Sequence, residues 1–195
     1  MIKHVIIDTE TTGLDPLVHD VIQFGGVVMI GGVITEKIEF RIHPRNISAA
    51  DPKALEVNGY TPGRWKGAEH CHRGAERVQW FLTRHADGVL VGHNLEFDLS
   101  FLAQLGEREG MAIEAGHRRI DTMHIVRAAL CPLGLRSTSL GAVCAFLGWE
   151  RRKAHSALSD CEDCARLLLN LCPPSAIFML RLRLEQRIKR IRRIR

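Results

Sequence analysis

The sequence predicts an α/β domain with a central mixed sheet of about five strands flanked by helices. Apolar, β-branched stretches within residues 1–42 have the pattern of three strands. Segments with helical spacing then alternate with two further short strand patterns. A chain of 195 residues, 46% of them hydrophobic, is long enough to bury one substantial core.

The strands are predicted from short apolar runs bounded by turn residues. They cover residues 4–8, 21–30, 33–42 and 88–91, with a last short strand near Ile120. Gly31 and Gly32 separate the second and third strands, which favours a hairpin at this point. The same glycines interrupt the longest apolar run, so no segment has the length of a membrane span.

The helices are predicted from apolar residues that recur at three and four positions. They cover residues 73–85, 94–105, 122–130, 138–147 and 156–171, with a last helix from about Ser175 to the C-terminus. The Pro- and Gly-rich residues 47–66 favour a loop with a short helix around 52–57. Because Pro173 and Pro174 interrupt the chain, we expect one domain over 1–172 and a basic amphipathic helix or tail over 173–195.

Positive charge is concentrated at the C-terminal end. Residues 181–195 contain eight Lys/Arg and one acid, so the rest of the chain carries −2 although the total is +5. One helical face among these basic residues is apolar and consists of Leu180, Leu184, Ile188 and Ile191. The tail could therefore face nucleic acid, bind a protein partner or be a plain solvated helix. The N-terminus has no signal-peptide core, so we expect a cytoplasmic protein without membrane association.

The six cysteines do not predict a disulfide framework in a chain of this length. Cys161 and Cys164 have the spacing of a redox or zinc pair, but no second pair follows at the spacing of a zinc finger. Both lie in a predicted helix, where we interpret them as small buried hydrophobic residues.

Asp8 and Glu10 follow the first predicted strand. Val5, Ile6 and Ile7 are typical of a buried strand, and residues two apart in a strand point to the same side. The two carboxylates should therefore project together at the end of a core strand. Their repulsion and burial would cost on the order of several kcal/mol unless a cation lies between them.

A third acid, Asp98, lies on the apolar face of a later helix. Positions three, four and seven residues further on are Phe101, Leu102 and Leu105. This spacing turns Asp98 toward the core, whereas Glu96 can point to solvent. A structural hydrogen bond to a neighbouring loop is the alternative role for Asp98.

A fourth acid, Asp160, lies near the start of the helix over 156–171. Cys164, Leu167 and Leu171 follow it at helical spacing, so it also lies on an apolar face. Capping of the helix start is the alternative role. His155, five residues earlier, would taken alone be an ordinary polar-contact histidine.

Carboxylates from three distant segments would repel one another strongly without cations. Oxygen-only ligands suit Mg²⁺ or Mn²⁺ and argue against zinc. Two such ions about 4 Å apart form a clamp for in-line attack on a phosphodiester. A neutral imidazole nearby can take the proton of the attacking water, and His155 is the candidate for this base.

These residues resemble the three motifs of the DEDDh 3′→5′ exonucleases, the DnaQ-like (polymerase III epsilon-like) branch of the ribonuclease H-like superfamily. Their order and spacing agree over roughly residues 1–172. The matching segments are Asp8-Thr9-Glu10-Thr11-Thr12-Gly13-Leu14, Asn94-Leu95-Glu96-Phe97-Asp98 and His155-Ser156-Ala157-Leu158-Ser159-Asp160.

The resemblance implies a ribonuclease H-like fold and an active metal-dependent enzyme. It implies that Asp8, Glu10 and Asp160 hold the first of two Mg²⁺ or Mn²⁺ ions, with Asp8 shared by the second. Asp98 would support the second ion, partly through water. His155 matches the general base of the family.

The resemblance also implies contacts with the terminal nucleotide. The residues concerned are Thr11, Thr12, Gly13, Leu14, Asn94 and Phe97. Leu14 would wedge against the terminal base, and packing is an equally good reason for Phe97. Asp121 also matches a recurrent family position, where we expect it to cap the following helix.

Three functions are compatible with these motifs. The first is a proofreading or repair exonuclease that removes nucleotides from DNA 3′ ends, with single-stranded DNA as the expected substrate. The second is an RNA-trimming exonuclease, since metal chemistry at the phosphate ignores the 2′-hydroxyl. The third is an accessory or binding subunit that contacts a DNA polymerase or another protein through the basic tail.

Overall fold

The computed structural model describes residues 1–116, 118–151, 156–172 and 182–183. The elements, in chain order, are β1 (Lys3–Thr11), β2 (Val21–Ile30), β3 (Val33–Arg41), α1 (Pro52–Val57), α2 (Cys71–Arg84), β4 (Val89–Gly92), α3 (Leu95–Arg108), β5 (Arg119–Asp121), α4 (Thr122–Leu130), α5 (Leu140–Leu147) and α6 (Ala157–Leu171), with short 3-10 turns at Ile47–Ala49 and Cys131–Leu133. The predicted strands and helices of this part of the chain are confirmed. The last helix, predicted from about Ser175, lies outside the described residues apart from Leu182 and Arg183.

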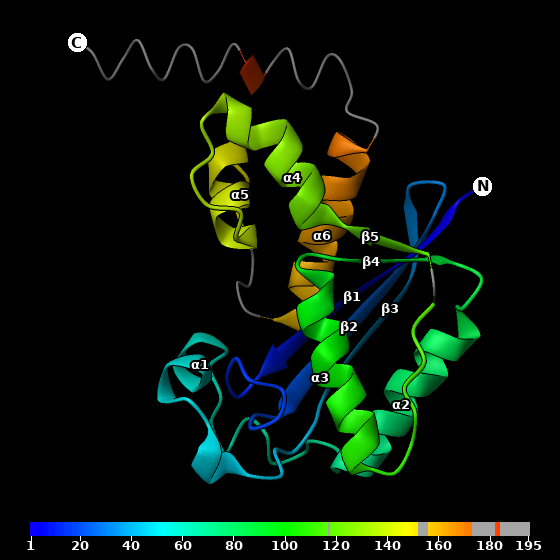
Figure 1. Cartoon of the computed structure of the whole chain (residues 1–195), viewed down its shortest axis with the longest axis vertical. Helices are drawn as coiled ribbons and strands as arrows, with labels where there is room; N and C mark the ends of the chain where they lie inside the picture. Colours follow the sequence, from blue (N-terminus) through cyan, green and yellow to red (C-terminus); the bar gives the residue numbers. More distant parts are fainter. Residues whose placement is uncertain (117, 152–155, 173–181, 184–195) are drawn as a thin grey trace.

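The five strands form one mixed sheet in the order β3-β2-β1-β4-β5. β1 and β3 run antiparallel to β2, whereas β4 runs parallel to β1 and β5 parallel to β4. Gly31 and Gly32, with φ of 59° and 88°, form the turn of the β2–β3 hairpin because positive φ is accessible to glycine without strain. The predicted α/β class with a sheet of about five strands is confirmed (Figure 1).

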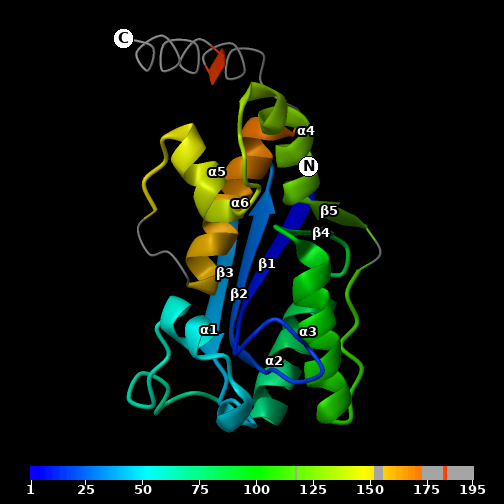
Figure 2. The same cartoon turned by 60° about the vertical axis from the view of Figure 1, so that its left-hand side comes forward.

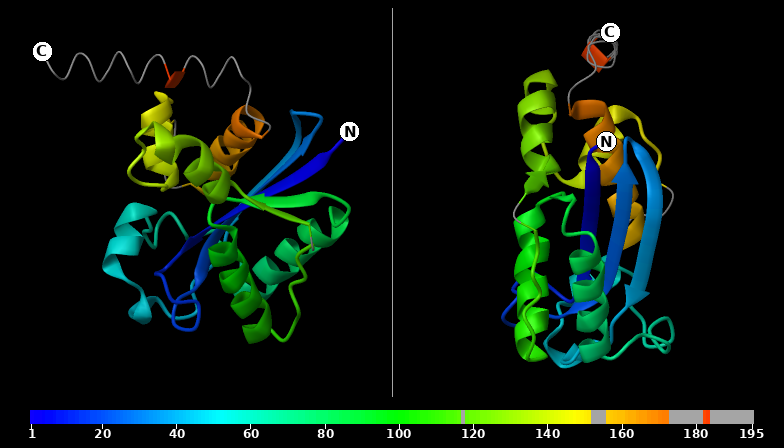
Figure 3. Two further views of the ribbon diagram at one scale, coloured as in Figure 1. Left: turned by 45° about the horizontal axis from the view of Figure 1, so that its top comes forward. Right: turned by 90° about the vertical axis from the view of Figure 1, so that its right-hand side faces the viewer.

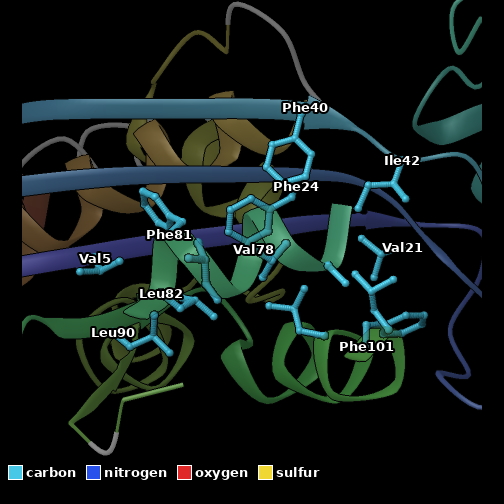
Figure 4. Packing of buried hydrophobic residues seen from close by; sticks show 14 of the residues in the cluster. Val5, Val21, Phe24, Phe40, Ile42, Val78, Phe81, Leu82, Leu90 and Phe101 are labelled. Carbon is cyan, nitrogen blue, oxygen red and sulfur yellow. The ribbon is translucent and has the colours of Figure 1, made fainter. Parts of the chain in front are cut away.

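Helices cover both faces of the sheet. Helices α2 and α3 lie on one face and α6 on the other, with α4 and α5 beside α6 (Figure 3). The first face is packed with aromatic and aliphatic side chains, among them Phe24, Phe81 and Phe101, all fully buried (Figure 4). Val78, Phe81 and Leu82 of α2 are buried in this core.

The opposite face contains the two cysteines of the C-x-x-C sequence. Cys161 and Cys164 are buried beside Ile6 and Val27, and both are free thiols. Burial raises the pKa of each thiol, as expected for an apolar environment. The interpretation of these cysteines as small core residues is therefore confirmed.

Unequal strand lengths leave the C-terminal half of β1 without a neighbouring strand on the side of β4. β4 pairs only with His4–Ile6 of β1, so β1 continues past β4 as far as Thr11 with β2 as its one neighbouring strand. The first turns of α3 and α6 approach this uncovered stretch of β1. Among the described residues, no helix is both long and apolar enough to cross a membrane.

Candidate active site

Three carboxylates converge beside the end of β1. Asp8 and Glu10 project from the strand and Asp160 from the first turn of α6, and one oxygen of each lies within 4.8 Å of the others. All three side chains are half-buried. Residues 150 positions apart in sequence thus share one site, as the three motifs predict.

A glycine allows α6 to come this close to the sheet. Gly25 of β2 pairs with Asp8, and a Cβ at Gly25 would lie only 2.4 Å from the carbonyl carbon of Ala157. Helix α6 therefore begins directly above the row of residues that contains Asp8. This close contact brings Asp160, in the first turn, over the carboxylates of β1.

Side chains of β2 and β3 then hold the first turn of α6. Gln23 Oε1 accepts a hydrogen bond from the amide of Ala157 at 3.3 Å. Glu39 Oε1 accepts from Ser156 Oγ at 2.7 Å and from the amide of Leu158 at 3.3 Å. These contacts satisfy amides at the helix start that have no partner within the helix.

Asp98 reaches the site from α3. Its side chain is only 3% exposed, and its Oδ1 accepts hydrogen bonds from the amide of Thr9 at 2.9 Å and from Thr9 Oγ1 at 2.7 Å. The amide of Thr9 lies beyond the end of β4, so Asp98 replaces the missing strand as its partner. The predicted buried position is confirmed. The alternative role was a hydrogen bond from a neighbouring loop, but the donor is a residue of strand β1.

The carboxyl groups destabilise one another's charged forms. Burial, and then the charges of Asp98, Asp160 and Glu10, raise the pKa of Asp8 well above its ordinary value. Burial and the neighbouring acids raise the pKa of Glu10 to about 8. Burial raises the pKa of Asp98 to about 7, although its hydrogen bonds from Thr9 act in the opposite direction. A site of this kind favours a bound cation.

Arg151 supplies part of that positive charge. Its guanidinium pairs with Asp160 through Nη2 and with Asp163 through Nε, the latter at 2.9 Å from Oδ2. The same charge lowers the pKa of Asp8 and of Glu10, against the larger effect of burial. Arg151 was not predicted, because it lies in a loop whose position relative to α6 depends on the tertiary fold.

The end of β1 and the loop that follows it carry four of the predicted nucleotide-binding residues. Thr11 and Thr12 are buried, and their hydroxyls bond within the loop, Thr11 Oγ1 donating to Gly13 O at 2.7 Å and Thr12 Oγ1 accepting from the amide of Asp20 at 2.8 Å. Gly13 packs against the ring of His19, which would lie 2.3 Å from a Cβ. Leu14 is 79% exposed at the tip. The loop thus has a fixed base and an apolar tip in solvent.

Two residues that the sequence did not indicate anchor this loop. Asn58 Nδ2 donates to Thr11 O at 3.0 Å. Arg108, in the last turn of α3, donates to three backbone carbonyls, those of Pro16, Leu17 and His19, at 2.7 to 3.0 Å. It also pairs with the carboxylate of Asp20 at 2.9 Å. No local pattern predicts these anchors, because each contact spans 47 residues or more.

The second motif begins with a strained residue. Asn94 has a φ of 74°, a left-handed conformation that asparagine tolerates better than most residues. Its amide donates to Asp121 Oδ1 at 3.0 Å, and Asp121 Oδ1 also accepts from the amide of Met123 at 2.8 Å. Asp121 therefore caps α4, as predicted, and in addition fixes the start of α3.

Phe97 and Glu96 illustrate the two sides of α3. The ring of Phe97 is half-buried and lies 4.8 Å from that of Phe101, so packing accounts for at least part of its role. Glu96 is exposed, as predicted, and pairs with Arg119 at 3.1 Å.

His155 lies outside the described residues, so its role as general base stays a prediction.

The fold and the clustered carboxylates define a nuclease-type α/β domain, and comparison with known proteins identifies it. The family model described as Exonuclease (RNase_T) matches residues 5–168, and the chain belongs to this family. The resemblance to the DEDD-type, DnaQ-like exonucleases is thereby confirmed.

Relatives and structural neighbours agree with this assignment. The chain is 34% identical to the PolC-type DNA polymerase III of Thermotoga maritima over 166 residues and 29% identical to that of Bacillus subtilis over 174 residues. The aligned regions include 85% and 89% of this chain, but only 11% and 12% of the respective polymerases. The structure of E. coli Exonuclease I in complex with a dT13 oligonucleotide shares the fold, with a TM-score of 0.75 and 20% identity over 89% of this chain and 42% of that one.

Proposed function

We propose that this chain is a metal-dependent 3′→5′ exonuclease that hydrolyses phosphodiester bonds at DNA 3′ ends and releases nucleoside monophosphates. The observation that supports this most strongly is the convergence of Asp8, Glu10 and Asp160 within 4.8 Å, with Asp98 buried beside them. Like charges gathered in this way are costly unless the site binds cations, and the matched family is one of exonucleases.

The donor set fits a pair of hard divalent ions, Mg²⁺ or Mn²⁺. All four side chains offer carboxylate oxygens, and the raised pKa values of Asp8, Glu10 and Asp98 favour exchange of protons for a cation. Asp8, Glu10 and Asp160 would hold the first ion, and Asp8 and Asp98 the second. When bound, such ions polarise the phosphate and lower the pKa of water.

The remaining roles are carried by side chains of the chain itself. His155 is proposed to take the proton of the attacking water, since a neutral imidazole acts near physiological pH. Leu14, exposed at the tip of its loop, is proposed to pack against the terminal base. The other proposed contacts of the terminal nucleotide are Thr11, Thr12, Gly13, Asn94 and Phe97. Because the hydroxyls of Thr11 and Thr12 bond within the loop, backbone groups are the better candidates there.

DNA is the proposed substrate because the relatives are named as DNA polymerases and a neighbour was solved with a DNA oligonucleotide. On the basis of the same names, we propose a role in proofreading or repair. The enzyme would act on single-stranded 3′ ends in the cytoplasm. The chain corresponds to about a tenth of the polymerases, so an association with a polymerase is proposed and not established. The basic tail over 173–195, which lies outside the described residues apart from Leu182 and Arg183, is the candidate contact.

The test of the substrate compares matched DNA and RNA strands that are labelled at the 5′ end. In Mg²⁺ or Mn²⁺ the DNA strand should shorten from its 3′ end with release of nucleoside monophosphates, faster when single-stranded or mismatched than when fully paired. Faster shortening of the RNA strand would replace the DNA assignment with the RNA-trimming alternative. Deletion of residues 181–195 should weaken DNA binding and its salt dependence if the tail contacts phosphates.

A further inference from the structure

A pocket that none of the motifs predicts lies beside the carboxylates. It has a volume of about 330 Å³, and its lining includes Gln23, Arg41 and Arg64. Glu10 of β1 pairs with Gln23 of β2, which pairs in turn with Arg41 of β3, so the three residues form one row across the sheet. With neighbouring strands about 4.8 Å apart, Arg41 lies about 10 Å from Glu10 along this row. Figure 2 shows the strand ends that carry the row, close to α1 and to the first turn of α6.

Both arginines rest on one tryptophan. The Cζ atoms of Arg41 and Arg64 lie 4.9 Å and 5.6 Å from the centre of the Trp65 ring, within the range of cation–π attraction. Trp65 is 1% exposed, and its Nε1 donates to Ile22 O at 2.9 Å, which fixes the ring. Arg41 Nη1 also donates to Arg64 O at 2.9 Å. Both guanidinium groups thus lie against one fixed ring, and a hydrogen bond joins Arg41 to the backbone of Arg64.

Their charges are not neutralised within the described part of the chain. Neither Arg41 nor Arg64 forms an ion pair there, and the buried Nε of Arg41 has no hydrogen-bond partner. The pocket also contains two acids. Glu39 bonds to the first turn of α6, and Glu69 pairs with Arg77 through Oε1, while Glu69 Oε2 is buried without a hydrogen-bond partner among the described residues. Two adjacent cations with free donors favour an anion, and planar guanidinium groups suit a phosphate in particular.

We propose that Arg41 and Arg64 bind a backbone phosphate of the nucleic-acid strand on the 5′ side of the bond that is cleaved. This proposal rests on the proposed exonuclease function. A stacked strand rises about 3.4 Å per phosphate, so a separation of about 10 Å places the contact within about three nucleotides of the metal site. The strand would pass over Gln23, which lies between Glu10 and Arg41 in the row. A contact of this kind selects for strand length and not for base sequence.

The test measures binding of a labelled oligothymidylate in excess chelator, where no cleavage interferes, at several salt concentrations. Arg41→Gln and Arg64→Gln should each weaken binding about tenfold, the loss expected for one charged hydrogen-bonding contact. The double variant should reduce the slope of log affinity against log salt by about 0.7, the contribution of one phosphate on a single strand, and each single variant should reduce it by less. Arg84→Gln is the matched control, because Arg84 also lies over a tryptophan, Trp80, at 5.0 Å, but on the opposite face of the sheet.

Cleavage kinetics on two substrates separate the contribution of this pocket from that of the metal site. In Mg²⁺, the two variants should raise KM for the oligonucleotide more than KM for the p-nitrophenyl ester of thymidine 5′-phosphate, which has no upstream phosphate. Wild-type affinity and salt slope in both variants would overturn the proposal, as would equal losses on the two substrates. A wild-type protein that binds the strand but does not cleave it would refute the exonuclease function, while the salt slopes would still decide the role of the arginines.

Discussion

At the scale of single residues, four carboxyl groups held in unfavourable surroundings account for the chemistry we propose. Asp8 and Glu10 face Asp160 within 4.8 Å, and Asp98 is buried beside them. Arg151 offsets part of the repulsion through its pair with Asp160. The site therefore costs the apo protein stability that a divalent cation would return.

This cost predicts a pH dependence of stability in the absence of metal. The pKa values of Glu10 and Asp98, about 8 and about 7 in the folded protein, lie above their ordinary values of 4.5 and 3.8. The folded state thus holds protons that the unfolded state releases, so these groups favour folding below about pH 4 and lose this contribution as the pH rises through 7 to 8. The melting temperature in chelator should fall over this range.

Differential scanning calorimetry at pH 5.5 and pH 8, with Mn²⁺ or with chelator, measures this dependence of the melting temperature on pH. Mn²⁺ should raise the melting temperature more at pH 8, where it replaces fewer protons. Glu10→Gln, which removes one of the titrating groups, should flatten the decline in chelator. A melting temperature that rises from pH 5.5 to pH 8 in chelator, with no response to Mn²⁺, would contradict the account of the site.

The residues of the site could be predicted to different degrees. The burial of Asp98 followed from Phe101, Leu102 and Leu105 on the same helical face, because helical periodicity is a local property. Arg151 could not be predicted in the same way, because its pairing with Asp160 depends on how a loop folds back on α6.

At the scale of elements, the site depends on how closely α6 and α3 approach β1. The contact of α6 with Gly25 places Asp160, and the hydrogen bonds of Asp98 to Thr9 join α3 to the strand. The elements themselves follow from apolar periodicity. Their close approach does not, since it depends on one glycine and on side chains far apart in sequence.

Gly25→Ala should disrupt this approach. The added methyl group would lie 2.4 Å from the backbone of Ala157, so α6 must shift, at a cost of about 1 to 3 kcal/mol. Because Asp160 moves with the helix, nuclease activity should fall at least tenfold even at temperatures where the variant is fully folded. Gly63→Ala is the control, since no atom lies within 4 Å of the position of its Cβ. Equal activity of the two variants would show that the helix contact does not position Asp160.

Arg108→Gln tests the anchoring of the loop that carries Leu14. Loss of the guanidinium removes the hydrogen bonds to Pro16, Leu17 and His19, and the freed loop should exchange its amide hydrogens faster. We expect KM for a single strand to rise several-fold with a smaller change in kcat, because Arg108 positions the loop and does not touch the reacting atoms. Arg73→Gln, an exposed substitution on α2, serves as the control. A normal KM and unchanged hydrogen exchange would exclude the positioning role.

At the scale of the whole molecule, the sheet order β3-β2-β1-β4-β5 brings three distant motifs to one end of β1. The α/β class and the five strands could be predicted, because strands and helices leave different periodicities in the sequence. The pocket of Arg41 and Arg64 could not, because it depends on the register of Glu10, Gln23 and Arg41 across three strands. The division into a domain over 1–172 and a basic tail over 173–195 stays a prediction.

The measurement that tests the central claim most directly is the release of nucleotides from a 5′-labelled single DNA strand by the wild type and by Asp8→Asn. We predict a ladder that shortens from the 3′ end in Mg²⁺ or Mn²⁺, no shortening in excess chelator, and a loss of at least about a thousandfold in rate for Asp8→Asn with the fold retained. Shortening that persists in excess chelator, or an Asp8→Asn variant as active as the wild type, would contradict the metal-dependent exonuclease.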